Sequence, residues 1–346
     1  MSDPSPDAAF ASCDLPWPEI AAEIPGHRSR VRQALTNLLG HPPFEEAPPL
    51  FVQTVYTSDE GGYWRHKVQY GTPNDDVVYA WLLIPKQLEG CVSAVICLPG
   101  SFMTPNWGKD GPAGLAGPAT AGDPEAYGRD LVRRGYVVLC PDYPCCGERT
   151  TPGLMSHDTT ELDRRFPEWT RVGLSAWDVS RAVDVLQGRP EVDGRRIGCV
   201  GWSQGGQMSV IGAALDARIG AVVSVCGWGP LRGVSGQRAV NWAQSYNFPG
   251  LRPYLASGSP LPVDMDHVVA MVAPRPFLDV RAVEDNVFDN RAEIEASLRR
   301  IGAAYELSGG EGRFGVAWLP GGHAYSAGAA RETEAWLHRW LWRGGR

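Results

Sequence analysis

One turn, Gly-Trp-Ser-Gln-Gly at positions 201–205, constrains the fold of this 346-residue chain more than any other stretch. The apolar approach at 196–200 is typical of a strand, and the run at 204–215 is compatible with a helix. At a sharp strand-to-helix turn the backbones lie so close that a side chain at either glycine would clash. The pattern therefore predicts an exposed Ser203 hydroxyl, with the amide of Gln204 at a helix N-terminus where it can stabilise an oxyanion.

The composition excludes several classes of function. Apolar residues make up 43% and charged residues 21% of the chain, as in ordinary soluble globular proteins. The net charge of −7 and the lack of a long basic run argue against a nucleic-acid partner. No stretch approaches 18 consecutive apolar residues, and the first residues lack the basic and apolar regions of a secretory signal. We therefore expect neither a membrane span nor export.

The eight cysteines show no spacing typical of a metal site, so we expect no metal, and nothing in the sequence calls for a cofactor. Four of them lie in apolar strand candidates, where a free cysteine acts as a small hydrophobe: Cys97, Cys140, Cys199 and Cys226. Reduced thiols favour a cytoplasmic location. No base is predicted beside the vicinal pair Cys145 and Cys146, so we expect structural thiols there as well.

The order of the predicted elements indicates an α/β fold. Residues 1–48 form an N-terminal arm with one amphipathic stretch at 28–39, followed by antiparallel strand candidates at 50–56, 64–70 and 77–84. Strands and helices then alternate, with strands at 92–98, 136–140, 196–200, 221–226, 277–281 and 315–319, and helices at 125–134, 171–187, 204–215 and 331–342. Such alternation predicts a mostly parallel central sheet with helices on both faces. We expect residues 49–346 to form a single domain.

Two aromatic-rich connections, at 143–170 and 227–271, do not fit the alternation. Long connections in compact domains are usually functional, and both leave the ends of predicted parallel strands, where ligands bind. We predict that residues 227–271 form a lid or cap. The alternative is a surface excursion packed on the scaffold.

A serine nucleophile needs a base within hydrogen-bond reach and an acid that orients the base. With a serine in such a turn, the order along the chain is serine, acid, histidine. Among seven histidines, only His323 lies in a glycine-rich loop after a terminal strand, so it is the candidate base. Asp285 is the preferred acid because it is the first exposed position after the strand at 277–281, with Glu284 and then Asp289 as alternatives.

The second oxyanion donor is expected in the loop after the strand at 92–98. Gly100 allows the backbone to turn toward the nucleophile. The backbone amide of Ser101 is therefore the candidate, with Phe102 next.

Motifs from about Val77 to the C-terminus resemble the α/β-hydrolase superfamily, and within it the dienelactone-hydrolase-like and acetyl-xylan-esterase-like group. They are Leu83-Ile84-Pro85, Leu98-Pro99-Gly100, Gly135-Tyr136-Val137-Val138, Pro141-Asp142-Tyr143, the segment at 189–206, Asp216-Ala217-Arg218-Ile219, Ala273-Pro274-Arg275-Pro276 and Gly322-His323. The resemblance implies the α/β-hydrolase fold and the triad Ser203, Asp285 and His323. In two places the chain departs from the pattern: Pro99-Gly100 stands where His-Gly is usual, and Trp202 precedes the nucleophile.

The sequence thus predicts a cofactor-independent serine hydrolase that cleaves a small-molecule carboxylic ester through an acyl-enzyme. Amide, peptide or C–C bond cleavage would use the same residues, although the short arm leaves no room for the propeller of prolyl-oligopeptidase-like enzymes. A hydrolase fold kept as a binding protein is a further alternative, but no triad member is missing. The arm could pack on its own domain or on a neighbour, which leaves a homo-oligomer open.

Overall fold

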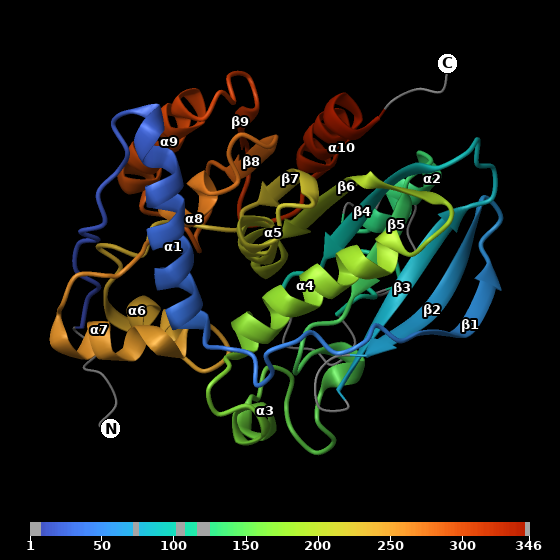
Figure 1. The fold of residues 1–346 in the computed structure, drawn as a ribbon, viewed down its shortest axis with the longest axis horizontal. Helices are drawn as coiled ribbons and strands as arrows, with labels where there is room; N and C mark the ends of the chain where they lie inside the picture. The colour runs from blue at the N-terminus through green and yellow to red at the C-terminus, as the bar shows by residue number, and fades with distance from the viewer. Residues whose placement is uncertain (1–7, 72–75, 102–107, 116–124, 343–346) are drawn as a thin grey trace.

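A nine-stranded sheet runs through the described part of the chain, in the order β1-β2-β3-β5-β4-β6-β7-β8-β9 (Figure 1). The computed structural model describes residues 8–71, 76–101, 108–115 and 125–342. At one end β1 (Val52–Asp59), β2 (Tyr63–Gly71) and β3 (Val77–Pro85) pair antiparallel, and β3 is antiparallel to β5 (Val137–Pro141). The strands from β5 onward in this order are parallel: β4 (Val92–Leu98), β6 (Val192–Trp202), β7 (Ile219–Val225), β8 (Phe277–Ala282) and β9 (Phe314–Leu319).

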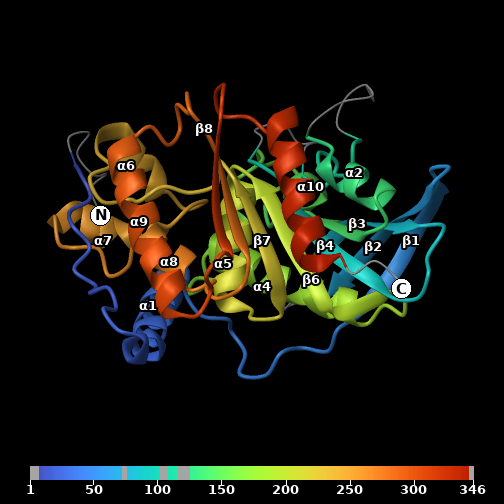
Figure 2. The ribbon, with the colours of Figure 1, turned by 90° about the horizontal axis from the view of Figure 1, so that it is seen from above.

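Helices cover both faces of this sheet, as predicted. Figure 2 shows α2 (Tyr127–Arg133) and α10 (Ala327–Leu341) on one face, with α4 (Arg171–Gln187) and α5 (Gln204–Leu215) on the other. The central strands are apolar on both sides for this reason. Along β4, Ala94 and Ile96 join the core under α4 and α5, whereas Val95 and Cys97 join the core under α2 and α10. The predicted α/β class with a mostly parallel sheet is confirmed.

The N-terminal region packs on its own chain. Helix α1 (Ile24–Leu39) lies against α4 and α8, and its apolar stripe is buried in the main core: Val31, Leu35, Leu38 and Leu39. The helix begins before the predicted residue 28, because Pro25 occupies its first turn, where a missing N–H costs nothing. The division into an arm and a single domain stays a prediction.

The two long connections contain short helices. The first holds α3 (Thr160–Arg165), and residues 227–271 hold α6 (Gly236–Trp242), α7 (Arg252–Ser257) and α8 (Met265–Ala270). A long helix that was not predicted, α9 (Arg291–Leu307), packs beside α8 at the same end of the sheet (Figure 1). Helix α8 is fully buried, while α6 reaches a cleft at the C-terminal ends of the strands. Among the described helices, none has the length and apolar character to cross a membrane.

Candidate active site

The turn between β6 and α5 holds Ser203 in the conformation that the motif predicted. Ser203 has φ 54° and ψ −120°, a backbone conformation that few non-glycine residues adopt. Its N–H donates a hydrogen bond to the Val225 carbonyl at 2.9 Å, which fixes the turn against β7. A Cβ at Gly201 would lie 2.2 Å from the Gly205 carbonyl carbon, and one at Gly205 would lie 2.1 Å from the Leu98 carbonyl oxygen. Both glycines are therefore required by backbone approach alone.

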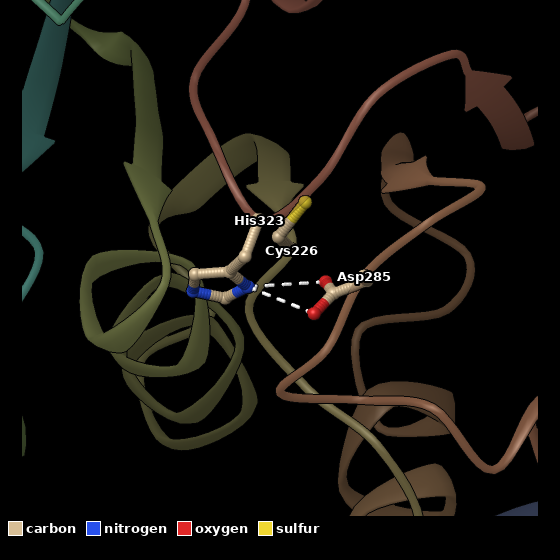
Figure 3. A group of neighbouring side chains, drawn as sticks. All are labelled: Cys226, Asp285 and His323. Carbon is tan, nitrogen blue, oxygen red and sulfur yellow. Dashed lines mark hydrogen bonds and ion pairs between the residues drawn. The ribbon is translucent and has the colours of Figure 1, made fainter.

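The structure brings His323 and Asp285 to this serine. His323 follows β9, and its Nε2 lies 2.8 Å from Ser203 Oγ. Asp285 follows β8, and both of its carboxylate oxygens lie 3.1 Å from His323 Nδ1, as the dashed lines in Figure 3 show. The imidazole is thus held between the hydroxyl and the carboxylate, which is the geometry that general-base activation of a serine requires.

The Asp285 carboxylate is anchored by backbone as well as by His323. Its Oδ1 accepts hydrogen bonds from the N–H groups of Val287 at 2.8 Å and Phe288 at 3.1 Å. Burial acts to raise the pKa of Asp285, but the hydrogen bond and charge of His323, with the two backbone donors, outweigh burial and hold that pKa below its usual value. Asp285 therefore stays ionised and can keep Nδ1 protonated.

The two alternative acids lie elsewhere. Glu284 is exposed, and its backbone N–H donates to the Gly321 carbonyl at 3.0 Å. Asp289 forms an ion pair with Arg238 of α6. The carboxylate that lies at hydrogen-bond distance from His323 belongs to Asp285, and the role of Asp285 as the triad acid stays a prediction.

Cys226 lies beside the Asp285–His323 pair at the end of β7, a placement that the sequence did not indicate (Figure 3). The Cys226 Sγ, one carboxylate oxygen of Asp285 and one ring nitrogen of His323 all lie within 4.8 Å of one another. Within the described part of the chain, these three residues form the group that could hold a metal ion. Burial and the neighbouring Asp285 carboxylate raise the pKa of Cys226 to about 12. The thiol is therefore protonated at neutral pH, and metal binding would first have to remove that proton.

The predicted oxyanion donors lie at the same cleft. Gln204 is the first residue of α5, where N–H groups have no partner within the helix, and Ser101 follows β4. Both residues line the cleft together with Ser203. The alternative donor, Phe102, lies outside the described residues. The assignment of these amides stays a prediction.

A cleft of about 300 Å³ opens at Ser203. Amide side chains, an arginine and three aromatic rings form much of its lining: Gln204, Gln207, Asn241, Asn247, Asn286, Arg238, Trp242, Tyr246 and Phe288. Asn241, Trp242, Tyr246 and Asn247 come from the predicted lid segment, whereas Asn286 and Phe288 were not predicted. Apart from Gln204, which belongs to the serine turn, the amide residues carry no sequence signal of their own, since the fold alone brings them together. Whether the segment moves as a lid stays a prediction.

One expectation about the cysteines is wrong. The imidazole Nδ1 of His157 lies 3.4 Å from Cys146 Sγ, so a base does lie beside the vicinal pair. His157 was missed because it is eleven residues from Cys146 in an irregular connection, and a turn brings the two together.

Comparisons with known proteins find related sequences and similar folds. A model of the Abhydrolase family matches residues 12–316. YtaP from Bacillus subtilis (strain 168) is 24% identical over 317 residues, which cover 91% of this chain and 100% of YtaP. Carbohydrate esterase MZ0003, from an unknown prokaryotic organism, is 26% identical over 200 residues, which cover 54% of this chain and 46% of that esterase. The chain thus aligns with about half the length of this second relative.

A solved glucuronoyl esterase from Solibacter usitatus superimposes with a TM-score of 0.69 at 18% identity, covering 95% of this chain and 96% of the esterase. An acetyl xylan esterase structure also shares the fold. The predicted superfamily resemblance is confirmed, and the dienelactone-hydrolase branch stays a prediction. Because the family model matches most of the sequence, the chain belongs to the Abhydrolase family of α/β-hydrolase-fold enzymes.

Proposed function

We propose that this protein is a serine esterase that cleaves carboxylic esters of carbohydrates through Ser203, His323 and Asp285. The observation that carries the proposal is the continuous chain of hydrogen-bond distances from Ser203 Oγ through His323 to Asp285, at the base of a cleft. Three residues that lie far apart in sequence meet in the order that nucleophilic catalysis needs. The strained backbone at Ser203 is of the kind that clusters at functional sites.

In the acylation step His323 Nε2 takes the proton of Ser203 as Oγ attacks the ester carbonyl carbon. The carbonyl oxygen becomes an oxyanion, which the backbone N–H groups of Gln204 and Ser101 stabilise. Collapse of this intermediate breaks the bond to the alcohol oxygen, and His323 returns its proton to that oxygen. Asp285 stabilises the imidazolium that exists between these two proton transfers.

Deacylation repeats the sequence with water. His323 removes a proton from water as the oxygen attacks the acyl carbon, and then protonates Ser203 Oγ as the acid leaves. Every proton that leaves a reactant passes through one imidazole, so no cofactor is needed for this chemistry.

The carbohydrate part of the proposal rests on the cleft and on the relatives. Amide groups can hydrogen-bond to sugar hydroxyls, and aromatic rings such as Trp242, Tyr246 and Phe288 can pack on the apolar faces of sugars. The named activities of the relatives, a carbohydrate esterase and a glucuronoyl esterase, are consistent with such a substrate.

Hydrolysis of a p-nitrophenyl ester series from acetate to octanoate, together with acetylated xylose and a methyl glucuronate ester, tests the proposal. The wild type should hydrolyse at least one of these esters, and Ser203→Ala should lose at least about 10⁴-fold in kcat. Ser259→Ala, at an exposed serine far from the triad in sequence, is the matched control and should behave as the wild type. If Ser203→Ala kept wild-type turnover, Ser203 would not be the nucleophile.

A further inference from the structure

A second nucleophilic group lies near the cleft, and the proposed esterase reaction does not use it. Cys146 follows β5 in the connection that leaves the C-terminal ends of the strands. Its Sγ lies 3.4 Å from His157 Nδ1 and accepts a hydrogen bond from Arg171 Nη2 at 3.2 Å. A cationic guanidinium and an imidazole nitrogen therefore face the same sulfur. Groups of this kind lie beside the reactive cysteines of many enzymes.

Arg171 connects this sulfur to the candidate active site. Its side chain is buried, and the Nη2 that faces Cys146 also lies 3.3 Å from the Gln204 side-chain oxygen. Its Nη1 donates to the Tyr246 carbonyl at 3.2 Å. Gln204 directly follows the nucleophile, and Tyr246 lines the cleft. A change at Cys146 that moves the guanidinium therefore acts on the residue whose amide we assign to the oxyanion.

Burial dominates the environment of three other cysteines, although Arg171 also acts on Cys145. Burial raises the pKa of Cys145 to about 11 and, more strongly, that of Cys199 and Cys226 to about 12. These three groups are protonated thiols at neutral pH, which are poor nucleophiles. Cys145 is thus an internal control one residue away from Cys146.

A side pocket gives small reagents a place beside His157, the neighbour of the sulfur. Its volume is about 410 Å³, and it is lined by Ser101, Met155, Ser156, His157, Asp158, Gln244 and Tyr246. The ring of His157 contacts Cys146 Sγ and is itself partly exposed. Cys146 is 6% exposed, which suits a reagent of the size of water better than a bulky one.

We infer that Cys146 is a modification site for small hydroperoxides, and that its oxidation lowers the activity of the neighbouring serine site. The sulfur attacks one peroxide oxygen, so that an S–O bond forms and the O–O bond breaks. Sulfur loses two electrons to the leaving oxygen, which also receives the thiol proton by way of His157. The products are a sulfenic acid and water, or an alcohol if the peroxide is organic.

The effect on activity follows from the position of Arg171. A sulfenic oxygen occupies space between Cys146, His157 and Arg171, and it competes with Gln204 for the same guanidinium nitrogen. Displacement of Gln204 would misplace the first residue of α5. This coupling rests on the proposed esterase function, whereas the modification itself does not.

The test treats the folded full chain with hydrogen peroxide, removes the excess peroxide, and then unfolds the protein in dimedone, which traps sulfenic acids that are buried in the fold, before peptide mass spectrometry locates the adduct. A Cys91→Ser background removes the exposed thiol. In this background, the variants Cys145→Ser and Cys146→Ser show which cysteine of the vicinal pair carries the adduct, because the adduct is lost only when the modified cysteine is replaced. We expect an adduct on Cys146, several-fold slower labelling in His157→Asn, and loss of esterase activity that tracks labelling. After treatment, Cys146→Ser should keep the turnover of its own untreated sample, while Cys145→Ser loses turnover as the parent does.

No adduct on Cys146 would overturn the site. An adduct on Cys146 with unchanged esterase turnover would overturn its coupling to Gln204. If the untreated protein hydrolyses no ester, the proposed function fails, but adduct mapping still decides whether Cys146 is the modified thiol.

Discussion

The side chains of Ser203, Asp285 and His323 owe their positions to the ends of three parallel strands, β6, β8 and β9. Parallel strands bring their carboxyl ends to one edge of the sheet, so residues separated by up to 120 positions meet there. The positive φ of Ser203 costs free energy, and the close backbones of Gly201 and Gly205 maintain it. The sequence could predict that these three side chains lie together because each residue follows a recognisable strand.

Replacement of the acid tests its assignment at the level of single atoms. Asp285→Asn keeps the shape of the side chain but removes the charge that stabilises imidazolium, so kcat should fall by about 10³–10⁴-fold with little change in KM. The neighbouring substitution Glu284→Gln is the matched control, because Glu284 is exposed, and it should change kcat less than about twofold. Steady-state kinetics on the best ester from the series measures both variants. A large loss in Glu284→Gln, with Asp285→Asn unaffected, would reverse the assignment.

Among the helices and strands, the sequence predicted most accurately those whose ends are marked by a recognisable residue or turn. The bounds of β4, α4 and α5 agree with prediction, since Thr170 caps α4 and the serine turn starts α5. Helix α9 was missed although Ile294, Ser297, Ile301 and Tyr305 repeat at helical spacing and are buried. The helices of residues 227–271 have six or seven residues each, too short for a periodic pattern to show.

A buried histidine on helix α8 makes the free energy of unfolding depend on pH. His267 is buried on it, stacked on Trp17 with ring centroids 4.2 Å apart and with its Nδ1 3.5 Å from His27 Nε2. Burial, with His27 contributing, lowers the pKa of His267 to about 4, against the opposing effect of Asp266. Between pH 4 and 6.5 the unfolded chain therefore binds more protons than the folded one, and stability falls as pH falls.

Urea unfolding at pH 7 and pH 5 measures this effect. We expect His267 to account for roughly 2 kcal/mol of the stability that the wild type loses between these values. His267→Asn should lose correspondingly less over the same interval, although it is less stable at pH 7. His338→Asn, at an exposed position on α10, should keep the wild-type dependence. Equal losses in all three proteins would show that His267 does not carry the effect.

For the molecule as a whole, the N-terminal region is part of the main core. Phe10 and the apolar stripe of α1 join the same cluster as the residues under α4 and α5. The sequence left open whether this region packs on its own chain, because an amphipathic stripe shows that a face is buried but not against what. In the structure its partners include α4 and α8.

This packing predicts that α1 stabilises the entire fold. Leu35→Ala should lower the free energy of unfolding by about 2–5 kcal/mol, because Leu35 is 1% exposed and its loss leaves a cavity. Gln33→Ala, on the exposed side of the same helix, should cost less than about 0.5 kcal/mol. Equilibrium urea unfolding compares the two variants. A similarly small cost for both would mean that the region is peripheral.

The central claim is that His323 and Asp285 activate Ser203 as a nucleophile. The most direct measurement is labelling with a fluorophosphonate, which forms a covalent bond with an activated serine, followed by peptide mapping. We predict a single adduct on Ser203 in the wild type, strongly slowed labelling in His323→Ala and none on that peptide in Ser203→Ala. Folded wild-type protein that takes up no label at Ser203, or labels equally fast without His323, would contradict the account.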